Sequence, residues 1–149
     1  MSALKPLVSV IIPTLNSELY LDDCLRSIIE QDYPRDRVEI IVADGGSTDS
    51  TIDIAKSYHA SVVSNPLRTG EAGKAAGLKF ASGDYIAFID SVNILPDKTW
   101  LNSMTKPFNS MGDPLCLFLG NYDRYCYITG RWTDLKIKAE IFDYYTKIE

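Results

Sequence analysis

The sequence predicts a single α/β domain with a mainly parallel sheet and helices on both of its faces. Short apolar segments of strand type alternate with segments whose apolar residues recur at helical spacing. The strand segments are apolar throughout, which is typical of parallel strands that are covered on both faces. The chain has 149 residues, a length that suits one domain with its own core.

Two strands and a helix are predicted in the first third of the chain. Residues 7–12 form a β-branched run that we expect to end at Pro13, and residues 38–43 (VEIIVA) form a second run. Ser17 is expected to cap the helix between them. The apolar face of that helix is assigned to Leu21, Leu25, Ile28 and Ile29.

The next elements continue the alternation. We expect a helix over 50–58, a strand over 61–64, an alanine-rich helix after the 65–70 loop through Phe80, and a strand over 85–89. Gly73 and Gly77 inside the alanine-rich helix each cost about 1 kcal/mol relative to alanine, which indicates close packing or a ligand there. Ser47, Thr48 and Asp49 are expected to act mainly as caps.

Beyond Pro96 the pattern weakens. One more helix, expected to end before Pro107, is indicated by Trp100, Leu101 and Met104. Residues 115–119 (LCLFL) indicate a further strand.

Composition excludes several classes of protein. With 15 basic and 20 acidic residues the net charge is −5, which disfavours binding to nucleic acid, so we expect no nucleic-acid partner. The three cysteines form no C-x-x-C pair, which disfavours a disulfide framework or a zinc site, and Cys24 is expected to be buried. The single histidine, His59, is expected near a helix end. With no signal-peptide pattern and no apolar run of about 20 residues, we expect a cytoplasmic protein.

Polar residues follow the predicted strands, where ligands bind in parallel sheets. Residues 13–16 follow the first strand, residues 44–49, which begin with Asp44, follow the second, and residues 65–70 follow the third. Asp44 suits either a contact to a base or sugar, or an Asx turn or helix cap. Asp90, with Ser91 and Asn93, follows the last strand of the alternation, where a carboxylate suits Mg²⁺ or Mn²⁺.

Two cations lie in the segment before and within the alanine-rich helix. Arg68 and Lys74 flank Gly70 and Gly73, and glycines allow a ligand to approach the backbone closely. The cations suit a diphosphate, and the alternative is a surface loop with solvated charges.

Three segments carry a resemblance to a known family. VSVIIPTLN, VEIIVADGGSTDST and GDYIAFIDSVNILP occur in this order across about residues 7–106 and resemble the nucleotide-sugar half of a family 2 glycosyltransferase. The resemblance implies the GT-A fold, a Rossmann-type sandwich. No G-x-G-x-x-G follows the first strand and no P-loop is present, which excludes the dinucleotide-binding and P-loop alternatives.

The resemblance implies a donor and a reaction. A sugar passes from a nucleotide-sugar donor, UDP- or GDP-linked, to an acceptor hydroxyl, with inversion and with help from a divalent cation (Mg²⁺ or Mn²⁺). The donor-binding residues expected from the resemblance and from the strand ends are Pro13, Thr14, Asn16, Asp44, Gly45, Arg68, Gly70, Lys74, Asp90 and Ser91. The cation is assigned to Asp90, which opens the D-x-D motif, and to Asn93.

The chain departs from the family pattern at two points. Val92 occupies the place of the second D-x-D aspartate, so the cation site is expected to be weakened. Residues 107–149, within the single domain 1–149, form a curtailed acceptor-side region. Its only candidate catalytic bases are Asp113, Asp123 and Asp134, for which surface or capping roles are the alternative.

The acceptor and the partners are less defined. A carbohydrate or a lipid acceptor is expected from the resemblance. A peripheral membrane contact through the aromatic segment 122–145 is an alternative to packing of that segment in the core. Two other functions stay open from the sequence: a degenerate nucleotide-sugar-binding module with little or no transfer, and a purely structural α/β domain.

Overall fold

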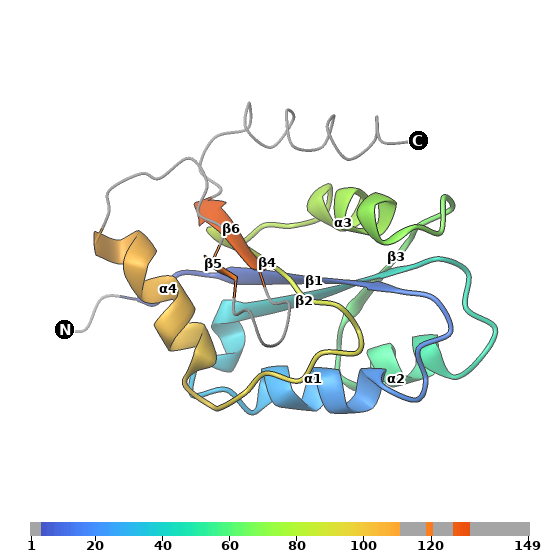
Figure 1. Ribbon diagram of the computed structural model, residues 1–149, viewed down its shortest axis with the longest axis horizontal. Helices are drawn as coiled ribbons and strands as arrows, with labels where there is room; N and C mark the ends of the chain where they lie inside the picture. Colours follow the sequence, from blue (N-terminus) through green and yellow to red (C-terminus); the bar gives the residue numbers. More distant parts are fainter. Residues whose placement is uncertain (1–3, 111–118, 121–126, 132–149) are drawn as a thin grey trace.

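The computed structural model describes residues 4–110, 119–120 and 127–131, with side chains through residue 106 (Figure 1). Within these ranges the strands are β1 (Val8–Thr14), β2 (Val38–Asp44), β3 (Ser61–Ser64), β4 (Tyr85–Phe88), β5 (Leu119–Gly120) and β6 (Tyr127–Arg131). They form one sheet in the order β3-β2-β1-β4-β6-β5. The first four strands of the chain pair in parallel, while β6 pairs antiparallel with β4 and β5. The predicted α/β fold with a mainly parallel sheet is confirmed.

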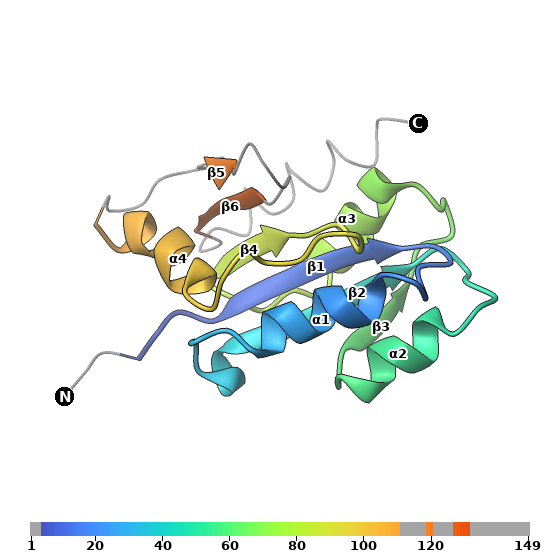
Figure 2. The same cartoon turned by 60° about the horizontal axis from the view of Figure 1, so that its bottom comes forward.

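Helices cover both faces of the sheet. The helical elements are α1 (Leu21–Ile29), the 3-10 turn η1 (Arg35–Arg37), α2 (Thr51–Ser57), α3 (Gly70–Leu78) and α4 (Trp100–Ser110). Helices α1 and α2 lie on one face and α3 on the other, as both views show (Figures 1 and 2). The larger apolar core lies on the α1 side and the smaller one, which includes Ile11, Ile41 and Leu78, lies under α3.

Helix α3 packs closely on the sheet because glycines face it. A Cβ on Gly77 would lie 2.4 Å from Cγ2 of Ile11, and one on Gly73 would lie 2.8 Å from Cβ of Pro13. Neither position has room for a methyl group without movement of the neighbouring chain. The predicted close packing of these glycines is confirmed, and it holds the start of α3 near the carboxyl end of β1.

The prediction that strand 1 ends before Pro13 is wrong, because β1 continues through Pro13 to Thr14. Pro13 pairs in register with Ala43 of β2. The carbonyl of Ile11 already faces the β4 side, where it accepts from the N–H of Ile89. Pro13 faces the same side two residues later, beyond the end of β4. Its missing N–H therefore removes no ladder bond.

Two details of the first helix also differ from the prediction. Ser17 does not cap α1 with its side chain; its carbonyl accepts from the N–H groups of Tyr20 and Leu21 instead. Ile29 is 37% exposed, and Cys24 fills the fourth apolar position of the buried face. The buried positions 21, 24, 25 and 28 form a narrower apolar stripe on the helix than the predicted set, which included Ile29. The predicted burial of Cys24 is confirmed.

Elements later in the chain follow the prediction with shifted ends. His59 lies just beyond α2, after Tyr58, with a φ of 58°, and its N–H donates to the carbonyl of Lys56. Helix α4 continues through Pro107 to Ser110, so the prediction of an end before Pro107 is wrong. Pro107 removes one backbone donor from α4, and the helix nonetheless continues past it. The first turn of α4 is held in the core by Trp100 and Leu101.

Some predictions fall outside the described ranges. Of the predicted strand 115–119, only Leu119 is described, and it lies in β5. The candidate bases Asp113, Asp123 and Asp134 lie outside the described residues. Among the helices that the structure describes, none combines the length and apolar character needed to cross a membrane.

Candidate functional site

A pocket of about 330 Å³ opens at the carboxyl edge of the parallel strands. It is lined by residues 13–17 and Tyr20 at and after the end of β1, by Asn65 and residues 68–70 before and at the start of α3, and by residues 91–92 after β4. The volume falls in the range of small-molecule sites. The loops that line the pocket leave the sheet at the right-hand side of Figure 1.

The structure brings about half of the predicted site residues to this pocket. Those that line it are Pro13, Thr14, Asn16, Arg68, Gly70 and Ser91. The predicted residues that do not line it are Asp44, Gly45, Lys74, Asp90 and Asn93. The pocket therefore forms where the sequence predicts it, with a smaller set of contact residues.

Asp44 is buried behind the pocket and organises the loop after β2. Its carboxylate accepts hydrogen bonds from the Thr14 hydroxyl (2.9 Å), the Ser47 hydroxyl and the N–H groups of Gly46 (2.9 Å) and Ser47 (2.8 Å). Burial raises the pKa of the Asp44 carboxyl, but the hydrogen bonds from Ser47, Thr14 and Gly46 outweigh it and hold that pKa below its ordinary value. This geometry is the Asx-type turn that was predicted for Asp44 as the alternative to a ligand contact.

The loops after β1 and β2 are held together by side chain to backbone bonds. Asn16 has a φ of 49°, its N–H donates to the Ser47 hydroxyl, and its Oδ1 accepts from the N–H of Thr48. Ser47 and Thr48 thus join two loops, while Asp49 accepts from the N–H of Thr51 at the start of α2. Asp49 thus binds a first-turn N–H of α2, as a cap does, although the N-cap residue is Ser50, whereas the prediction is wrong for Ser47 and Thr48.

Gly45 fixes the distance between the β2 loop and the segment before α3. Its N–H donates to the carbonyl of Thr14 (2.8 Å). A Cβ built on it would lie 3.3 Å from Cα of Arg68. Glycine therefore lets the backbone of Arg68 lie against the ends of β1 and β2.

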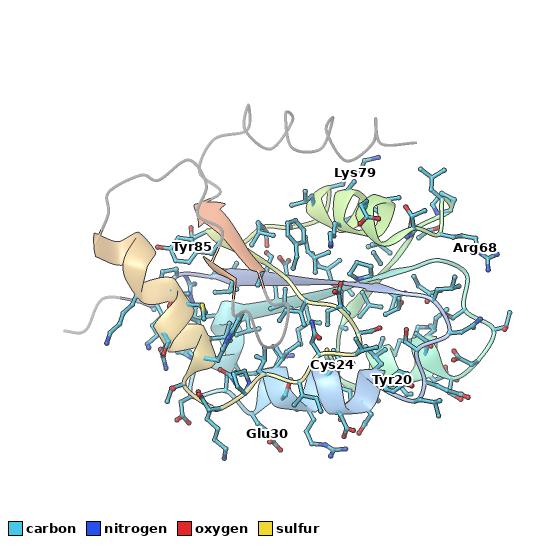
Figure 3. All side chains as sticks on the ribbon, in the orientation of Figure 1. Tyr20, Cys24, Glu30, Arg68, Lys79 and Tyr85 are labelled. Carbon is cyan, nitrogen blue, oxygen red and sulfur yellow. The ribbon has the colours of Figure 1, made fainter. Side chains whose placement is uncertain are left out.

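The two predicted cations differ in their relation to the pocket. Arg68 is exposed, has a φ of 65° and lines the pocket, and its guanidinium forms no ion pair with any residue in the described ranges. Figure 3 shows its side chain extending outward from the segment before α3. Lys74, one turn into α3, is half-buried and does not line the pocket.

The segment after β4 offers few ligands for a cation. Asp90 is exposed, and its carboxylate has no partner in the part of the chain that the structure describes. Asn93 donates its N–H to the carbonyl of Asp90, and the Ser91 hydroxyl donates to that of Ser17 at 3.1 Å. Val92 is 61% exposed and lines the pocket. No cluster of three His, Cys, Asp or Glu residues occurs within the described ranges.

Asn65 is a pocket residue that the sequence analysis did not name as a binding residue. It is 2% exposed, its N–H donates to the carbonyl of Asp44 (2.8 Å), and its Nδ2 donates to the carbonyl of Thr69 (2.9 Å). Its Oδ1 is buried without a hydrogen-bond partner in the described structure. The feature of the sequence that could have indicated Asn65 as a binding residue is its position directly after the strand 61–64 and before Pro66. Leu15, Thr69 and Val92 also line the pocket and lie in the predicted strand-end segments 13–16, 65–70 and 90–93, whereas Ser17 and Tyr20 line it without having been predicted.

A second hollow lies beside the carboxyl-edge pocket and shares Asn65 with it. It has a volume of about 270 Å³, runs between β3 and α3, and is lined mainly by apolar residues such as Leu67, Ala72 and Phe80. No predicted binding residue lines it.

Sequence comparison matches the chain to known glycosyltransferases. The profile of glycosyl transferase family 2 matches residues 9–147. An uncharacterized glycosyltransferase of Haemophilus influenzae is 32% identical over 151 aligned residues, which cover 97% of this chain and 58% of that protein.

Two solved structures share the fold of this chain. Staphylococcus aureus TarS 1–349 in complex with UDP-GlcNAc superposes with a TM-score of 0.62 and 28% identity, over 76% of this chain and 38% of that chain. The mannosyltransferase PcManGT of Pyrobaculum calidifontis in complex with GDP-Man and Mn²⁺ gives a TM-score of 0.64 and 26% identity, over 77% of this chain and 36% of that chain.

The chain spans less than two thirds of the length of each of these relatives. The family profile nonetheless covers β1 through the end of the parallel sheet, including every segment that lines the carboxyl-edge pocket. The sandwich of parallel strands and helices is GT-A-like, and the chain belongs to glycosyl transferase family 2.

Proposed function

We propose that the carboxyl-edge pocket binds a nucleotide-sugar donor, UDP- or GDP-linked. The donor's sugar then passes to a hydroxyl of a carbohydrate or lipid acceptor with inversion. The observation that supports this most is the pocket itself, because two of the three segments that carry the family resemblance, 8–16 and 83–96, contribute to its lining. Two proteins of the same fold have structures in complex with UDP-GlcNAc and with GDP-Man.

The residues of the pocket suit the nucleoside part of such a donor. The unpartnered Oδ1 of Asn65 is an acceptor, complementary to the ring N–H that uracil and guanine both carry. A buried acceptor without a partner costs about 1–3 kcal/mol, and a ligand N–H would recover part of it. Thr14 and Asn16 supply the wall beside it. Asp44 acts behind them by holding the loop that carries Ser47 in place.

The residues that could bind a cation do not form a complete site. Asp90 contributes one carboxylate, and Asn93 contributes at most a neutral oxygen. With Val92 in place of a second carboxylate, Mg²⁺ or Mn²⁺ would bind these residues more weakly than a pair of carboxylates would hold it. No step of the reaction is therefore assigned to a cation.

The transfer step itself needs an acceptor site and a base. The acceptor hydroxyl forms a bond to the anomeric carbon while the bond from that carbon to the diphosphate oxygen breaks, and a carboxylate takes the hydroxyl proton. Asp113, Asp123 and Asp134 remain the candidates for this base. The relatives named above are transferases, which favours transfer over the alternative of a binding module without activity.

Calorimetric titration with nucleoside diphosphates tests the proposal. UDP or GDP should bind, and Asn65→Leu should weaken the tighter of the two at least about tenfold, or about 1.4 kcal/mol. Asn102→Leu on α4 is the matched control and should leave binding unchanged, because Asn102 does not line the pocket. Absence of binding by any nucleoside diphosphate would falsify the proposal, and equal affinity of wild type and Asn65→Leu would remove Asn65 from it.

A further inference from the structure

We propose that the donor's diphosphate is neutralised in this chain by Arg68 and the N-terminus of α3 instead of by a divalent cation. Donor binding should then be nearly independent of Mg²⁺ and Mn²⁺. The inference rests on the proposed function, because it assigns the charge balance of that same site.

The first part of the argument is the weakness of the cation ligands. Asp90 is exposed and does not line the pocket, whereas Val92 does. Where a carboxylate would face the diphosphate together with a cation, the pocket presents an isopropyl group. A hard divalent cation binds oxygen ligands and gains nothing from this side chain. The diphosphate must therefore find positive charge elsewhere in the pocket.

Arg68 supplies one such charge at a fixed place. Its backbone is held by its N–H donating to the carbonyl of Asn65 (3.1 Å) and by its contact with Gly45. Arg68 lines the pocket, and its side chain is exposed and has no carboxylate partner among the described residues. A guanidinium offers planar, paired donors that match phosphate oxygens. The absence of a competing ion pair leaves these donors available to a ligand.

The start of α3 supplies further donors beside Arg68. Thr69 caps this helix by accepting from the N–H of Ala72, while the N–H groups of Gly70 and Glu71 donate to no residue in the described ranges. Nothing lies within 4 Å of a Cβ built on Gly70, so a phosphate can approach its backbone. Free N–H groups at a helix start carry partial positive charge and bind anions.

A second observation, on Asn65, supports a ligand in this part of the pocket. Asn65, three residues before Arg68, is 2% exposed, lines this pocket as well as the neighbouring hollow, and has an Oδ1 with no hydrogen-bond partner among the described residues. An acceptor of this kind does not bind phosphate, but it suits the nucleoside that precedes the phosphates. The nucleoside acceptor and the phosphate donors thus lie in one short segment, in the order in which a nucleoside diphosphate would need them.

Titration of UDP, or of GDP if that is the tighter ligand, tests the inference in EDTA and in millimolar Mn²⁺. Wild type should bind with affinities that agree within about threefold between the two conditions. Arg68→Met should lose at least about tenfold in both, and Arg68→Lys should lose less. The free nucleoside should bind both proteins equally, because it lacks the phosphates that Arg68 contacts.

Two further variants sharpen the test. Lys56→Met removes an exposed charge on α2 that is outside the pocket, and it should bind the diphosphate like wild type. Val92→Asp restores the carboxylate at an exposed position and should make binding at least about tenfold tighter in Mn²⁺ than in EDTA. Circular dichroism of each variant establishes that it is folded.

The outcomes separate this inference from the proposed function. If wild type binds the diphosphate at least tenfold more tightly in Mn²⁺, or if Arg68→Met binds it like wild type, the inference is wrong while the proposed function stands. A Val92→Asp variant that is folded and indifferent to Mn²⁺ also contradicts it. If neither UDP nor GDP binds under either condition, the proposed function itself fails.

Discussion

Asp44→Ala is expected to lower the free energy of unfolding by about 3 kcal/mol and to abolish measurable nucleotide binding. The substitution leaves the hydroxyls of Thr14 and Ser47 and the N–H groups of Gly46 and Ser47 without their shared acceptor. Removing the acceptor of several buried donors costs more than removing one ordinary hydrogen bond. The loop after β2 also holds Asn16 through Ser47, so the pocket wall should lose its shape. Urea unfolding and calorimetry measure the two effects.

A control and a pH series identify the carboxylate as the cause. Asp53→Ala, at an exposed position in α2, should change the free energy of unfolding by less than about 0.5 kcal/mol. The pKa of Asp44 is lowered in the folded state, so its contribution is fully present above the unfolded pKa of about 4 and is lost as the pH falls through the folded pKa. The stability difference between wild type and Asp44→Asn should therefore shrink below about pH 4. A difference that stays constant down to about pH 2 would contradict this account of Asp44.

Gly77→Ala should destabilise the fold by about 2 kcal/mol, although alanine favours helices over glycine. A Cβ at this position would lie 2.4 Å from Cγ2 of Ile11, which is fully buried in the centre of the sheet. Helix α3 must therefore move away from β1, and overpacking of this kind costs about 1–3 kcal/mol. Urea unfolding gives the magnitude.

Gly70→Ala is the matched control for this prediction. It lies in the same helix, and nothing lies within 4 Å of its built Cβ, so its stability should be equal to or slightly above that of wild type. The double variant Gly77→Ala with Ile11→Ala should be less unstable than the sum of the single variants by at least about 1 kcal/mol, because the clash is absent. Strict additivity would show that the loss in Gly77→Ala has another origin.

Local patterns in the sequence predicted most of the parallel sheet. The strand at 61–64 has the predicted bounds, and β2 and β4 differ from their predictions by one residue. Buried parallel strands are continuous apolar runs, so their signal does not depend on the rest of the fold. The close packing of Gly77 was also predictable, because glycine inside a helix has a cost that something must offset.

Other features depend on contacts between distant segments and were not predictable from local patterns. Pro13 was expected to end a strand, but it faces the side of β1 where β4 has already ended. Asp44 and Asn65 meet through a bond from the N–H of Asn65 to the carbonyl of Asp44, and nothing in either local sequence shows that Asn65 is left with an unpartnered Oδ1. Which polar groups have hydrogen-bond partners can be determined only from the tertiary structure.

Where a nucleotide binds is measured most directly by chemical-shift mapping of the ¹⁵N-labelled protein. Titration with UDP or GDP should shift the amide signals of Thr14, Gly70 and Ser91, which come from separate segments around the carboxyl-edge pocket and do not line the apolar hollow. Signals from the apolar hollow between β3 and α3, such as those of Ala76 and Phe80, should stay in place. Shifts confined to that hollow, or no shifts with any nucleoside diphosphate at millimolar concentration, would contradict the assignment of the carboxyl-edge pocket as a donor site.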